Sequence, residues 1–143
     1  MSNIDLSRII SAEARAARAL KAAQARALGL LADRLRETAE AFSGPVPQVE
    51  RDGWAEKTAA ARAVLAQAAT PAQQALLAAE AAVLREDGVR LAGRIVANAE
   101  RHALFAARMA GLRRKYLKAL ELAEDPETVA GLIRDLEQDL PPA

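Results

Sequence analysis

The sequence predicts an all-α protein: an elongated helical bundle or coiled-coil-like hairpin, with one long helix over about residues 71–123 and shorter helices beside it. Hydrophobic residues make up 52% of the 143 residues, yet aromatic residues make up only 3%, and alanine is the commonest type. Such a composition is typical of long helices. Apolar residues recur at heptad spacing over the second half of the chain, which predicts sustained helix packing.

The N-terminal ten residues lack helical periodicity and are interpreted as an extended lead-in. We expect this lead-in to dock on another surface through Ile4, Leu6, Ile9 and Ile10. A helix over 11–42 follows, with Ser11 as its N-cap. The larger apolar residues of this helix fall on one face at 100° per residue. Arg8, Arg15, Arg18 and Arg26 cluster on the opposite side, which we interpret as a solvated face.

A linker over 43–52 ends this helix, because a glycine and two prolines within Ser43-Gly44-Pro45-Val46-Pro47 cannot continue it. Asp52 is predicted to cap a second helix over 53–69. The only tryptophan, Trp54, stands at the start of that helix. We interpret it as a packing anchor, with ligand stacking as the alternative.

The strongest local signal is Thr70-Pro71-Ala72-Gln73, which combines a threonine N-cap, an early proline and a glutamine that completes a capping box. The helix that starts there is predicted to run to residue 123. Asp87-Gly88 is a residue pair typical of a helix break, yet the heptad spacing continues through it without a shift. Two interpretations therefore stay open: one continuous helix, or two nearly collinear segments broken at 87–88.

The last helix is predicted over 126–140, where Asp125 is the cap and Pro126 the first helical residue. Together with 53–69 and 71–123, it completes a helical domain over 53–143. The acidic last helix is expected to fold back on the basic stretch before it or to reach a neighbouring subunit, mainly through its apolar face.

One face of the long helix is the predicted interaction surface. Asn98 and His102 lie one turn apart on this seam, and we expect them to form a buried pair that fixes the helix register. The apolar arc is wider than a two-stranded seam needs, which favours a bundle. The seam comprises Leu84, Leu91, Ile95, Asn98, His102, Phe105, Met109, Leu112 and Tyr116.

No arrangement of residues indicates catalysis. The chain has no cysteine and only one histidine, which excludes disulfides, thiolate chemistry and metal sites built on several imidazoles. The glycines do not form a phosphate-binding loop. We therefore expect no enzymatic activity, no catalytic residues, no metal and no cofactor.

The net charge of +1 conceals blocks of opposite sign. Residues 85–118 contain nine basic and three acidic residues, whereas residues 119–143 contain one basic and seven acidic residues. Such blocks favour neutralisation within or between subunits. The alternative interpretation is a nucleic-acid-associated basic helical protein, in which Arg113, Arg114, Lys115 and Lys118 contact phosphates.

Several short motifs occur in order along most of the chain: Ile4-Asp5-Leu6-Ser7-Arg8, Gly53-Trp54 with Lys57, Thr70-Pro71-Ala72-Gln73, Ile95-Val96-Ala97-Asn98-Ala99, Ala110-Gly111-Leu112-Arg113-Arg114 and Asp125-Pro126. With these motifs the sequence resembles small alanine-rich helical proteins from the tail-fibre and tail-assembly regions of tailed bacteriophages and prophages. The resemblance implies a non-enzymatic, tail-associated structural or assembly protein that acts through helix–helix contacts.

The expected partners are proteins, either further copies of the chain or other tail proteins. Apolar runs are short and interrupted by charge, so no membrane span is predicted. The N-terminus lacks a secretory apolar core. We therefore expect the protein in the cytoplasm of a bacterial host or in a virion.

Overall fold

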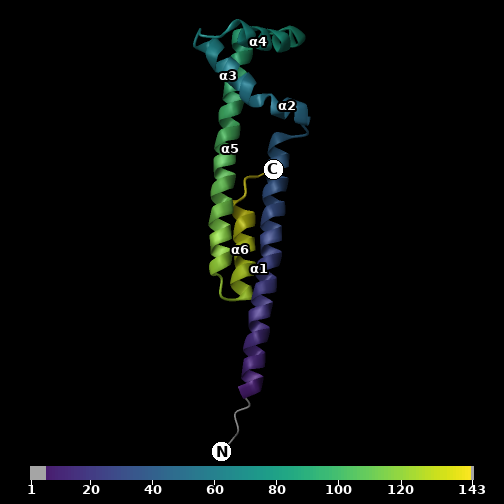
Figure 1. Cartoon of the computed structure of the whole chain (residues 1–143), viewed down its shortest axis with the longest axis vertical. Coiled ribbons are helices and arrows are strands. Elements are labelled where there is room, and N and C mark those ends of the chain that lie inside the picture. Colours follow the sequence, from purple (N-terminus) through teal and green to yellow (C-terminus); the bar gives the residue numbers. More distant parts are fainter. Residues whose placement is uncertain (1–5, 143) are drawn as a thin grey trace, which may run out of the picture. The chain divides into compact units, whose positions relative to one another are not determined.

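The computed structural model describes residues 6–142, and this part of the chain is all-α, as predicted, with six helices and no strand. The chain forms two compact units (Figure 1). The first combines α1, α6 and the part of α5 from Met109 onward, and the second runs from Pro45 to Arg108. The helices are α1 (Leu6–Ser43), α2 (Gln48–Asp52), α3 (Trp54–Leu65), α4 (Pro71–Leu84), α5 (Gly88–Leu122) and α6 (Pro126–Asp139).

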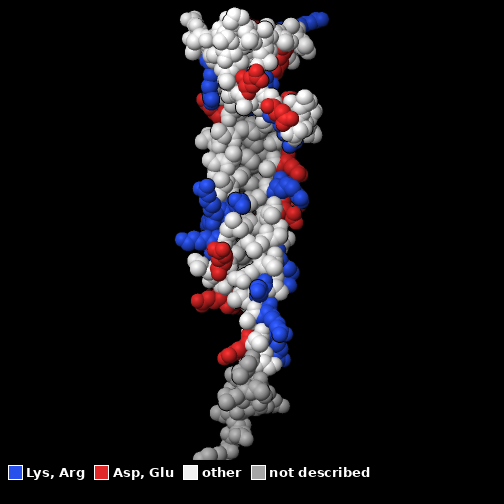
Figure 2. Space-filling model, viewed as in Figure 1, with Lys and Arg blue, Asp and Glu red and all other residues white. Residues whose placement is uncertain are grey.

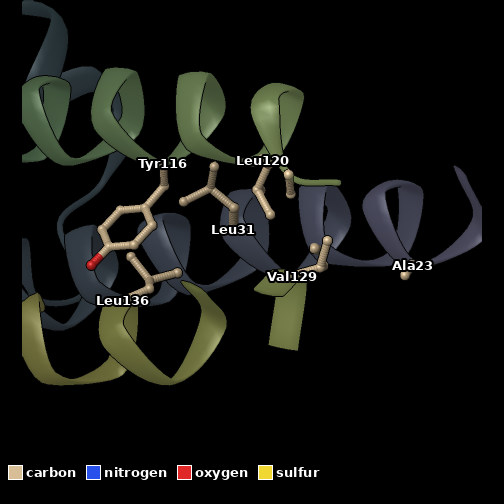
Figure 3. Close-up of a cluster of buried hydrophobic side chains, with 8 residues drawn as sticks. Ala23, Leu31, Tyr116, Leu120, Val129 and Leu136 are labelled. Atoms are coloured by element: carbon tan, nitrogen blue, oxygen red, sulfur yellow. The ribbon is translucent and has the colours of Figure 1, made fainter. Parts of the chain in front are cut away.

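The first unit is a three-helix arrangement around one apolar cluster. Leu31 comes from α1, Tyr116 and Leu120 come from α5, and Leu136 comes from α6; all four are almost completely buried (Figure 3). Removing a leucine of this kind from water contributes about 1.5–3 kcal/mol. The cluster therefore joins segments that lie about a hundred residues apart in the sequence.

Polar contacts complete the packing of α1. The Gln24 amide donates hydrogen bonds to the carbonyl oxygens of Leu120, at 2.9 Å, and Ala123, at 3.4 Å. These carbonyls belong to the end of α5, where the helix leaves backbone acceptors without intrahelical partners. The Gln24 side chain thus caps α5 from the neighbouring helix.

Arg34 of α1 makes a bidentate ion pair with Glu137 of α6, with both N···O distances at 2.5 Å. Its third contact, at 2.7 Å, is with Glu37 on its own helix. The hydrogen bonds from Arg34 lower the pKa of Glu137, and the two carboxylates raise the pKa of Arg34. Because these side chains remain partly exposed, the pair mainly orients α6 on α1.

The predicted extended lead-in is wrong from Leu6 onward, because α1 already begins there. Ser11 consequently lies inside the helix and is not its N-cap. Ile4 lies outside the described residues, and Leu6, Ile9 and Ile10 belong to α1, although their side chains are not described. Residues 11–19 are all exposed, and this part of α1 continues beyond the connection between α5 and α6 (Figure 1).

The predicted linker over 43–52 is only partly irregular. Helix α1 ends at Ser43, followed by Gly44 in the left-handed region with φ 69°, a conformation that suits glycine. Helix α2 then occupies Gln48–Asp52, so Asp52 ends a helix and does not cap one. The residue that precedes α3 is Gly53.

Helices α3, α4 and the first part of α5 form the second unit. Ala60 and Ala61 of α3 pack with Leu77 of α4 and Leu91 of α5 in a cluster made largely of alanine. Helix α3 ends at Leu65, earlier than the predicted residue 69, because Gln67 adopts φ 57° and the Ala68 amide bonds back to the Ala63 carbonyl. This is the hydrogen-bond pattern of a Schellman C-cap.

The predicted helix over 71–123 is two helices. Helix α4 ends in a second Schellman pattern, with Arg85 at φ 53° and the Glu86 amide bonded to the Ala81 carbonyl. Asp87 then caps α5 by accepting a hydrogen bond from the Arg90 amide at 3.0 Å. The segments are not collinear either: α4 runs across the axis of α5 (Figure 1), and Ala81 packs in the same cluster as Ile95.

The two predicted proline-containing helix starts are confirmed. Thr70 accepts a hydrogen bond from the Gln73 amide at 3.2 Å, and the Gln73 side chain accepts one from the Thr70 amide at 2.9 Å. Asp125 accepts a bond from the Thr128 amide at 2.7 Å, and this bond lowers the pKa of Asp125. Local sequence therefore determines where α4 and α6 begin.

Replacing Thr70 by alanine is expected to lower the free energy of unfolding by about 1 kcal/mol, because it removes the acceptor of the capping box. The measurement is urea denaturation followed by circular dichroism. Ser11→Ala is the matched control: Ser11 lies inside α1, so the effect should stay within about 0.5 kcal/mol. Equal losses in both variants would contradict this assignment of the caps.

Glu137→Gln is expected to reduce stability at neutral pH and to match the wild type in acid. Since the native pKa of Glu137 is lowered, its carboxylate stabilises the fold above the unfolded pKa of about 4.3, and this stabilisation is lost as pH falls through the native pKa. Urea midpoints measured across this range test the prediction. A difference in urea midpoint between wild type and variant that stays constant at every pH would contradict the prediction. Glu121→Gln, which changes an exposed carboxylate, is the control.

Candidate interaction surface

One exposed side of α4 carries only apolar side chains. We name it the α4 face; Val83, with 84% of its surface exposed, is its most accessible large residue. Each residue of the face has another three or four positions away along the helix, so the set shares one side. It consists of Ala72, Ala75, Leu76, Ala79, Ala82 and Val83, all exposed.

The other side of α4 is apolar as well, because Leu77 and Ala81 fill the cluster of the second unit. The only charged residue of α4 is Glu80, which lies at the flank and forms an ion pair with Lys57 of α3 at 3.0 Å. Uncharged surface covers most of the α4 end of the second unit (Figure 2). Because α4 is apolar on two opposite sides and only one of them is buried, its exposed apolar face is the leading candidate for a contact surface.

Two further apolar side chains are exposed near the junction of α4 and α5. Leu84 is 48% exposed at the end of α4, and Val89 is 58% exposed in the first turn of α5. Leu84 was predicted as a seam residue, and its exposure leaves it available for a contact.

The remaining predicted seam residues do not form one continuous surface. Leu91 and Ile95 are buried in the second unit, and Tyr116 is buried in the first, where Leu112 packs against the same cluster. These four residues therefore stabilise the fold of the chain itself. His102, Phe105 and Met109 are half-buried on α5.

The predicted buried pair of Asn98 and His102 is wrong, because Asn98 is exposed. His102 instead contacts Trp54, with the ring centroids 5.1 Å apart and the planes inclined by 57°. A tilted aromatic contact at this distance is a favourable packing geometry. Trp54 therefore joins the start of α3 to α5, in agreement with its predicted role as a packing anchor.

Tyr116 links α5 to α6 by a partly buried hydrogen bond. Its hydroxyl donates to a carboxylate oxygen of Asp139 at 2.6 Å, and the Lys115 ammonium donates to the same oxygen at 2.7 Å. Burial of the ring, followed by the bond to Asp139, raises the pKa of Tyr116 to about 12. The bond to Asp139 also raises the pKa of Lys115.

The predicted phosphate-contact residues differ in whether a carboxylate already pairs with them. Arg113, Arg114 and Lys118 are exposed on α5, whereas Lys115 already has a carboxylate partner in Asp139. The acidic last helix thus folds back on the basic stretch within the first unit, which was one of the two predicted arrangements. Partial neutralisation reduces the attraction of this stretch for a polyanion.

Sequence reasoning missed the α4 face, because it treated residues 71–123 as one helix with one seam. A signal was present: Pro71–Leu84 is a fourteen-residue helix with a single charged residue. In the part of the chain that the structure describes, no group of three or more histidine or carboxylate side chains is placed to hold a metal ion. No helix among these residues has the length and apolar character required to cross a membrane.

The only tyrosine of the chain should ionise with a pKa near 12 in the folded protein and near 10 when unfolded in urea. Because the native pKa is raised, the stabilisation is complete below pH 10 and is lost as pH rises through the native value. Absorbance of tyrosinate near 295 nm measures both titrations. Asp139→Asn should move the native titration towards pH 10, and coincident curves for folded and unfolded protein would contradict both the burial of the ring and its hydrogen bond to Asp139.

Comparison of the chain with protein-family models, with curated proteins and with solved structures finds no match.

Proposed function

We propose that this protein is a non-enzymatic structural or assembly protein that acts through helix–helix contacts. The observation that carries the proposal is the α4 face: six exposed apolar side chains on one side of a helix whose opposite side is already buried. Covering a side chain such as Val83 would contribute about 1.5 kcal/mol or more. An assembled partner would therefore stabilise the chain as well as recruit it.

The biological setting that we propose is the tail of a bacteriophage or prophage, with the protein in the bacterial host cytoplasm during assembly or in the virion. This part rests on the resemblance of the sequence motifs to proteins of tail-fibre and tail-assembly regions. A helical protein with an uncovered apolar face suits an assembly role, because the core of a protein–protein interface is apolar.

A nucleic-acid-associated function is the second candidate, and the exposure of Arg113, Arg114 and Lys118 on α5 is the observation that favours it. Phosphate binding of this kind releases counterions and weakens steeply with salt. Titration with duplex and single-stranded DNA at low salt tests it. Saturable binding that Arg114→Ala weakens would support this candidate, and no binding at low salt would remove it.

The tail-assembly proposal predicts a defect in particles. Deletion of the gene from the phage or prophage that carries it should leave particles with missing or incomplete tails, as seen by electron microscopy. Supplying the wild-type chain should restore them. Ala79→Glu should fail to do so, because it places a charge in the middle of the α4 face, whereas Ala22→Glu, an exposed site on α1, should succeed. Normal tails after deletion would overturn the proposal.

A further inference from the structure

We infer that the α4 face is covered by the α4 face of a second copy of this chain, in an antiparallel pair about a two-fold axis. This inference rests on the proposed helix–helix function and names its partner. Three observations support it: the face carries no charge, two copies of the face can pack on each other without burying a charge, and its residues have the spacing of a helix-packing surface.

The occupant of the α4 face must be uncharged. No residue of the face can pair with a charge, and a charged side chain placed against it would lose its water without gaining a partner. The rim is charged: Lys57 and Glu80 pair at the flank, and Arg85 is exposed just beyond the end of the helix. The surface is therefore complementary to an apolar strip of about the same length as α4.

Among the described residues, the other long helices present charged outer faces. Arg15 and Arg18 lie on the exposed side of α1, and Arg90 and Glu100 are exposed on α5. Packing any of these faces on α4 would bury a charge without a partner. The α4 face of a second copy avoids this cost, and a surface that matches itself is what a two-fold dimer requires.

The spacing of the alanines suits close pairing of two helices. Ala72, Ala75, Ala79 and Ala82 follow the three-and-four spacing of heptad core positions. An antiparallel pair with its axis near residue 77 sets Ala72 opposite Ala82 and Ala75 opposite Ala79 of the second copy. Leu76 and Val83 then flank this line of small residues and close over it. Antiparallel helices also place opposite ends of their dipoles together.

The size of the contact sets the expected strength. A fourteen-residue helix is about 21 Å long, so the pair buries less than the roughly 800 Å² per partner of a standard interface. We therefore expect a reversible dimer that dissociates in the micromolar range.

Sedimentation velocity of the full chain from about 1 µM to 1 mM is expected to show reversible dimerisation. Ala79→Glu should weaken it at least about 100-fold, because two carboxylates would face apolar surface close to the axis. Ala22→Glu makes the same chemical change on the exposed side of α1 and should leave dimerisation unchanged. Circular dichroism and thermal unfolding establish that both variants remain folded.

Mixing variants tests the antiparallel register. Ala75→Lys alone should be monomeric like Ala79→Glu, and an equimolar mixture of the two should associate, because position 79 of one copy faces position 75 of the other. Association of A79E with A79K, but not with A75K, would indicate a different register and overturn the proposed pair.

Two other outcomes would also overturn the inference. A wild-type chain that stays monomeric at 1 mM would exclude self-pairing, and a dimer that A79E leaves intact would use another face. Neither outcome removes the proposed function. If the chain is monomeric and A79E still fails to restore tails, the α4 face binds a different protein; if A79E restores tails fully, the function proposed for this face fails.

Discussion

The burial of Tyr116 among α1, α5 and α6 is the contact on which the first unit depends. Its ring is 1% exposed, and it shares one apolar cluster with Leu31, Leu120 and Leu136. No other described side chain of this cluster combines an aromatic ring with a polar tip. The hydroxyl reaches Asp139 near the end of α6, so the same residue fills the core and orients the last helix. Arg34 and Gln24 then tie α1 to the structure that Tyr116 defines.

The buried residues form two separate clusters, and the cluster of the second unit contains few large side chains. Ala60, Ala61 and Ala92 are completely buried in the second unit, where their small volume lets helices approach closely but contributes little burial per residue. A helix held by such a cluster gains from any further apolar partner. This is the physical basis for regarding the uncovered α4 face as part of an incomplete packing arrangement, and for the assembly role proposed for the chain.

Much of the fold followed from local chemistry. The caps at Thr70 and Asp125 lie where the sequence placed them, because a capping side chain bonds only to amides three residues away. The heptad spacing over 71–123 led to a wrong prediction around residues 85–88, where the chain leaves α4 and starts α5 in another direction. Arg85 takes a left-handed conformation that favours glycine, and an arginine at this position gives no sign of that conformation in the sequence. The lead-in was misjudged because its helix continues from a long, strongly helical neighbour.

The sequence by itself determined the all-α class, the starts of α4 and α6, and the stop after α1, since each depends on residues within one or two turns of one another. Only the tertiary structure decided which apolar side of each helix is covered. Burial of Tyr116, contact of His102 with Trp54, and exposure of Asn98 and Val83 all depend on residues distant in the chain. Periodicity marks a helix side as apolar, but it carries no information about which element packs against that side.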